Sequence, residues 1–90
     1  MIKHVSITVK GKVQGVFFRA ATKEKADELG INGFVRNQPD QSVYIEAEGE
    51  DALLDELILW CKHGPPLAHV ESSDSDEGPI KGFNEFLIQL

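Results

Sequence analysis

The segment Val5–Gly30 has the sequence VSITVKGKVQGVFFRAATKEKADELG. Its first residues alternate between apolar and polar side chains, which is the pattern of a strand with one buried face. After Gly11 comes a short loop, and residues suited to a core then recur at helical spacing within Phe18–Leu29. The glycine that closes the segment readily adopts the left-handed conformation that commonly ends a helix. The segment therefore predicts a strand, a loop and a helix that begins at or beside Arg19.

The rest of the chain predicts a hairpin, a second helix and two further strands. Alternating residues on both sides of a turn containing Pro and Asp indicate the hairpin. The second helix has apolar residues at i, i+3, i+4 and i+7, and we expect Lys62 and His63 in its last turn. The expected elements are an extended segment at Phe34–Asn37, the turn Gln38–Gln41, a strand at Val43–Gly49, a helix with apolar positions from Leu54 to Cys61, and strands at Ala68–Ser73 and Phe86–Leu90.

This order of elements is strand, helix, strand, strand, helix, strand, with one more strand at the C-terminus. Right-handed crossovers place both helices on the same face of one sheet. We therefore predict an α+β fold, a ferredoxin-like sandwich whose mainly antiparallel sheet carries two helices on one face. Ninety residues suffice for one core, so we expect residues 1–90 to form a single domain.

Charge and composition narrow the possible partners. The net charge of −6 disfavours nucleic acid and anionic membranes as partners, because both attract basic surfaces. The charge is uneven: residues 1–39 hold seven Lys or Arg against three acidic residues, whereas residues 40–90 hold two against twelve. An anionic ligand should therefore prefer the N-terminal part. A single cysteine and the lack of an export signal or long apolar stretch lead us to expect a cytoplasmic protein. We expect a monomer, because no patterned exposed apolar stripe indicates an interface between copies.

The loop between the first strand and the first helix is the candidate binding site. Its sequence is GKVQGVFFR from Gly11 to Arg19, and its two glycines allow successive backbone N–H groups to face one concavity beside a helix N-terminus. Arg19 offers a planar fork that pairs with two phosphate oxygens. We therefore expect a phosphate group to be held by the residues of this loop, namely Val13, Gln14, Gly15, Val16, Phe17, Phe18 and Arg19.

The same loop resembles the acylphosphatase signature G-x-V-Q-G-V-x-F-R at every fixed position. A second pattern of that family is met by Gly33, Val35, Asn37, Asp40, Val43 and Gly49, although Gln41 replaces one of its glycines. The resemblance implies an enzyme that hydrolyses an acyl phosphate to a carboxylate and inorganic phosphate, without metal or cofactor. It also implies that Arg19 holds the phosphate and that Asn37 orients the attacking water.

That chemistry is reasonable for these residues. A carboxylate leaves without a general acid, and phosphoryl transfer requires mainly alignment and charge stabilisation. Neither motif offers an obvious nucleophile, so we predict direct attack by water, with its proton passing to a phosphate oxygen of the substrate. Gln41 occupies a turn position that favours left-handed backbone. We expect the turn either to change type or to carry strain of about 1 kcal/mol.

Two alternatives use the same fold without catalysis: a module that binds a phosphate ligand, and an RNA-binding module. The identity of the acyl group of the substrate stays open, because neither motif specifies it.

The other reactive residues of the chain have ordinary structural interpretations. Cys61 lies on the apolar stripe of the second helix and is expected to be a core thiol. His4, His63 and His69 lack a metal-site spacing, and Pro79 excludes a calcium loop after Asp74 because a glycine is needed there.

Overall fold

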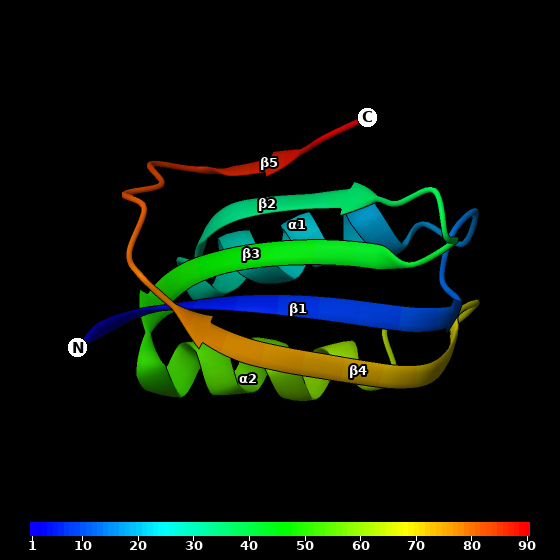
Figure 1. The fold of residues 1–90 in the computed structure, drawn as a ribbon, viewed down its shortest axis with the longest axis horizontal. Helices are drawn as coiled ribbons and strands as arrows, with labels where there is room; N and C mark the ends of the chain where they lie inside the picture. The colour runs from blue at the N-terminus through cyan, green and yellow to red at the C-terminus, as the bar shows by residue number, and fades with distance from the viewer.

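Two helices pack on one face of a five-stranded sheet in the computed structural model, which describes all residues from Met1 to Leu90 (Figure 1). The strands lie in the order β4-β1-β3-β2-β5, and all neighbours are antiparallel except β2 and β5. This arrangement confirms the predicted ferredoxin-like sandwich with an added C-terminal strand. The elements are β1 (Ile2–Lys12), α1 (Phe18–Leu29), β2 (Asn32–Asn37), β3 (Val43–Glu50), α2 (Asp51–Cys61), β4 (His69–Gly78) and β5 (Phe86–Ile88).

The core lies between the helices and the sheet. β1 and β3 each contribute alternate apolar residues to it, as their period-two patterns predicted, although Glu46 and Glu48 on the other face of β3 are buried as well. Side chains that are at most 2% exposed come from both layers and include Ile7, Val9, Ile45, Phe18, Ala26, Leu54 and Leu57. None of the helices has the length and hydrophobicity needed to cross a membrane.

Both helices end through identifiable backbone geometry. The first begins at Phe18, beside Arg19 as predicted, and ends at Gly30, whose φ of 69° is left-handed. The second ends at Cys61, so the prediction that Lys62 and His63 occupy its last turn is wrong. The N–H groups of Lys62 and His63 donate to the carbonyls three residues earlier, each at 3.2 Å, so the chain leaves the helix through tighter turns of the 3₁₀ type.

The outer strands differ in length from their predicted bounds. β4 continues to Gly78 instead of stopping at Ser73, because its backbone pairs with most of β1, from Lys12↔His69 to His4↔Gly78. The acidic residues of β4 are exposed, so no apolar alternation marks this extension in the sequence. β5 pairs with β2 over only three residues. Of the apolar residues expected to alternate there, Phe86 is buried, whereas Leu90 is fully exposed.

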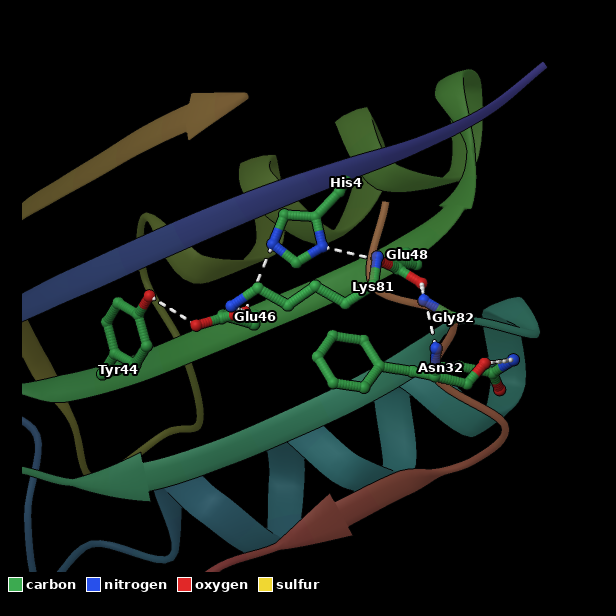
Figure 2. A network of polar contacts seen from close by, with 8 residues as sticks. His4, Asn32, Tyr44, Glu46, Glu48, Lys81 and Gly82 are labelled. Atoms are coloured by element: carbon green, nitrogen blue, oxygen red, sulfur yellow. Dashed lines mark hydrogen bonds and ion pairs between the residues drawn. The ribbon is translucent and has the colours of Figure 1, made fainter. Parts of the chain in front are cut away.

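The connection between β4 and β5 crosses from one edge of the sheet to the other (Figure 1). On the way it contacts polar side chains on the face away from the helices (Figure 2). The Glu48 carboxylate accepts hydrogen bonds from the N–H groups of Gly82 at 3.0 Å and Phe83 at 3.1 Å, and also from that of Lys81. His4 Nδ1 lies 2.7 Å from the same carboxylate. Glu48 therefore fixes the path of the connection and the start of β5.

Glu46 forms the second centre of this network. Tyr44 donates its hydroxyl to Glu46 at 2.8 Å, and the Lys81 ammonium donates at 2.7 Å. Burial by itself raises the pKa of the Glu46 and Glu48 carboxyls, but the hydrogen bonds and charges around them outweigh it and lower both values. Both side chains are therefore buried as hydrogen-bonded carboxylates.

The turn between β2 and β3 keeps a left-handed residue without glycine. Gln41 has a φ of 76°, and its N–H donates to the carbonyl of Gln38 at 3.1 Å. Asp40 accepts the N–H of Ser42 at 3.0 Å, which holds the turn together. Of the two expected outcomes, the turn with a strained residue is therefore the one observed.

We predict that the unfolding free energy falls in acid because the pKa values of Glu46 and Glu48 are lowered. A depressed carboxyl pKa stabilises the fold at pH values above the unfolded-state pKa of about 4.3. This contribution is lost as the pH falls from there through the folded-state values. Urea unfolding across this range measures the effect. Glu48→Gln should flatten the dependence and reduce stability at neutral pH by about 2 kcal/mol, because buried donors lose their charged acceptor.

Glu71→Gln is the matched control, because Glu71 is exposed and has no ion pair or side-chain hydrogen bond. It should change stability by less than about 0.5 kcal/mol. Wild-type stability in the Glu48 variant would contradict a structural role for that carboxylate.

We predict that Gln41→Gly stabilises the protein by about 0.5–1 kcal/mol, since glycine adopts positive φ without a steric cost. The midpoint of urea unfolding reports the change. Gln89→Gly, at a residue without positive φ, should not stabilise the chain. Equal effects of the two substitutions would show that Gln41 carries no strain.

Candidate active site

The loop after β1 is anchored by its apolar side chains and bent by two left-handed residues. Val13 and Val16 are buried in the core, at 1% and 4% exposure. Gly15 and Phe17 have φ values of 74° and 64°. The two buried valines hold the loop against the core, and the two left-handed residues bend the backbone sharply before α1 begins.

The backbone N–H groups of this loop and of the first two residues of α1 are free. No N–H from Val13 to Arg19 donates a hydrogen bond within the chain, and the first bond of α1 runs from Ala21 N–H to the Phe17 carbonyl at 3.0 Å. Seven consecutive donors therefore lack an internal acceptor at the positive end of a helix dipole. Such an array is suited to an anion.

Arg19 lies half-buried beside these donors. One guanidinium nitrogen donates to the backbone carbonyl of Gln89 at 2.9 Å, and no carboxylate forms an ion pair with it. Gln89 in turn donates its N–H to the carbonyl of Val35 in β2 at 2.9 Å. The guanidinium is thus held against the C-terminal segment while its other donors stay available.

Asn37 is the last residue of β2, in register with Val43 of β3. Its side chain is half-buried and makes no hydrogen bond within the chain. The loop is tied to the turn that follows Asn37, because the Gln14 amide donates to the carbonyls of Gln38 and Ser42, both at 2.9 Å. Asn37 and the loop therefore lie at the same end of the sheet (Figure 1).

A hollow of about 330 Å³ opens beside the loop. It is lined by Gly15, Phe17, Phe18, Arg19, Ala20 and Ile88. The structure thus brings Arg19 and part of the predicted loop to one hollow. Asn37 does not line this hollow; it lies at the C-terminal end of β2.

Two contributions to this site were not foreseen from the sequence. Gln14 was expected only as part of the loop, but its side chain also bridges the loop to the hairpin turn. Gln89 contributes a backbone carbonyl, which any residue carries, so no side-chain pattern announces it. The other singled-out residues lie elsewhere: Cys61 is buried in the core, Asp74 belongs to β4, and His4 lies between Glu46 and Glu48.

Comparison with known proteins adds independent evidence. The acylphosphatase family model matches residues 5–88. An acylphosphatase of Rubrobacter xylanophilus is 50% identical over 89% of this chain and 73% of its own length. One from Methylococcus capsulatus is 47% identical over 97% of this chain and 96% of its own. The solved structure of an acylphosphatase from Coxiella burnetii superposes with a TM-score of 0.95 at 35% identity, covering 98% of this chain and 93% of that one.

We predict that the Cys61 thiol does not react in the native protein. Burial raises its pKa to about 12, so almost no thiolate exists at neutral or mildly alkaline pH. Labelling with a disulfide reagent near pH 8 should be at least about 100-fold slower in the folded than in the unfolded chain. Rapid labelling of the folded chain would place the thiol at the surface.

Proposed function

The chain belongs to the acylphosphatase family of acyl-phosphate hydrolases, and we propose that its loop Val13–Arg19 holds the substrate phosphate while Asn37 orients the attacking water. The observation that carries this proposal is the run of free N–H groups from Val13 to Arg19, which ends at an arginine without a carboxylate partner. Free N–H donors and a guanidinium without a carboxylate partner together provide what a phosphate dianion needs.

The phosphate oxygens accept hydrogen bonds from the loop amides and from the remaining donors of Arg19. Because the amides are fixed by the curled backbone, they need little reorganisation as charge shifts during the reaction. The Gln89 carbonyl at 2.9 Å keeps the guanidinium from turning away from the loop. Arg19 therefore both binds the phosphate and stabilises the charge that develops on it.

Hydrolysis then proceeds by direct attack of water on phosphorus. The water oxygen forms a bond to phosphorus, and the bond between phosphorus and the acyl oxygen breaks with its electron pair on the leaving carboxylate. The Asn37 amide is free of internal hydrogen bonds, so it is available to accept from and donate to the incoming water. Its task is alignment, which by itself contributes strongly to such reactions.

The proton of the water passes to a phosphate oxygen of the substrate, giving a carboxylate and inorganic phosphate. No acidic or histidine side chain lines the hollow beside Arg19. Asp40, in the turn that follows Asn37, accepts hydrogen bonds from the Ser42 hydroxyl and N–H, and these lower the pKa of its carboxyl. A carboxylate of lowered pKa is a weak base, which supports transfer to the substrate itself.

We predict different kinetic losses for the two residues. Arg19→Ala should reduce kcat/KM for benzoyl phosphate by at least about 100- to 1,000-fold and weaken competitive inhibition by inorganic phosphate, since an oxyanion donor and a phosphate ligand are lost together. Asn37→Ala should lower kcat by about 100-fold while inhibition by phosphate persists, because only the water loses its partner. Absorbance assays on variants with native circular dichroism measure both.

Arg36→Ala is the matched control, because Arg36 is exposed and does not line the hollow. Its guanidinium carbon lies 4.9 Å from the centre of the Tyr44 ring. The variant should retain activity within about threefold. Undiminished turnover and phosphate inhibition in a folded Arg19→Ala variant would refute the assigned phosphate site.

A further inference from the structure

Phe17 is an unusual residue to find at the surface of this loop. Its side chain is 75% exposed, and its φ of 64° places a bulky residue in the left-handed region. Gln41 is the only other non-glycine residue of the chain with positive φ. An exposed aromatic ring in strained backbone gains nothing for the core, and strain of this kind concentrates at functional sites.

Ile88 lies on the same hollow, although it comes from the opposite end of the sequence. Its side chain is 39% exposed, and together with Phe17 and the small Ala20 it forms the apolar, solvent-accessible part of the lining. Arg19 is the only charged residue that lines the hollow. One positive charge thus faces an otherwise uncharged wall.

In the proposed function, Phe17 is adjacent in the chain to groups that hold the phosphate, and Ile88 is adjacent to the group that holds the Arg19 guanidinium. Phe17 immediately precedes Phe18 and Arg19, and its own N–H belongs to the free donors. Ile88 immediately precedes Gln89, whose carbonyl holds the guanidinium at 2.9 Å. In an acyl phosphate only one oxygen separates phosphorus from the acyl carbon, so the acyl substituent lies within a few bonds of the bound phosphate. Since Phe17, Arg19 and Ile88 line one hollow, the acyl substituent of a phosphate held at Arg19 then lies near these two side chains.

We propose that Phe17 and Ile88 form a subsite for the acyl group and make the chain selective for acyl phosphates with an uncharged, apolar and preferably aromatic acyl substituent. This inference rests on the proposed position of the phosphate at Arg19. A ring against Phe17 and Ile88 removes apolar surface from water and gains an aromatic contact. An acetyl group is too small to cover both side chains. A second anionic group on the acyl chain finds no second cation on the wall.

The test compares benzoyl phosphate with acetyl phosphate. The ratio of their kcat/KM values isolates the acyl group, because the phosphate and the attacking water are common to both substrates. We expect Phe17→Ala and Ile88→Ser each to lower the benzoyl-to-acetyl ratio by about 5- to 10-fold. Phe17→Gly removes the ring and relieves the positive φ, so it gives a folded variant even where alanine is poorly tolerated.

Leu87→Ser is the matched control. Leu87 is 48% exposed in the same strand as Ile88 but does not line the hollow, so its substitution should leave the ratio unchanged. An unchanged ratio in both the Phe17→Gly and Ile88→Ser variants would overturn the subsite.

Competitive inhibition by inorganic phosphate distinguishes failure of the acyl subsite from failure of the proposed function. If phosphate inhibition is lost in Arg19→Ala but the ratio is insensitive to Phe17 and Ile88, only the acyl subsite is wrong. If Arg19→Ala keeps both phosphate inhibition and turnover, the phosphate lies elsewhere, and the subsite fails with it.

Discussion

The antiparallel pairing of β1 with β3 is the constraint from which the site follows. With Val9 opposite Val43, the loop that leaves β1 and the turn that precedes β3 lie at the same end of the sheet. The Gln14 amide then joins them through the carbonyls of Gln38 and Ser42. The loop after β1 and the strand end that carries Asn37 thus become neighbours through backbone pairing and the Gln14 side chain.

Contacts on the sheet face away from the helices determine where the C-terminal segment lies. Glu48 binds three successive N–H groups of the connection between β4 and β5, and this directs the chain across the sheet to pair with β2 (Figure 2). Only because β5 is placed there do Ile88 and Gln89 reach Arg19. A buried carboxylate at one end of the sheet therefore helps to position a guanidinium at the other.

The uneven charge of the chain fits this arrangement. The N-terminal part carries the free N–H groups and Arg19, whereas half of the acidic residues of the C-terminal part are either buried in the network around His4 or exposed on β4. None of the acidic side chains lines the hollow to which Arg19 contributes. The lining of this hollow thus carries one cation and no acidic residue, despite the net charge of −6.

The sequence by itself determined the class of fold, the start and end of α1, and the loop Val13–Arg19, because periodicity, a terminal glycine and a contiguous motif are local signals. It also marked Gln41 as a residue where the turn either changes type or carries strain, and the φ of 76° decides for the left-handed, strained residue. Only the tertiary structure decided that β4 continues to Gly78, that Lys62 lies beyond α2, and that Gln89 holds Arg19. These features depend on backbone hydrogen bonds between distant segments. Since every residue carries the same N–H and carbonyl, the order of side chains does not encode such pairings directly.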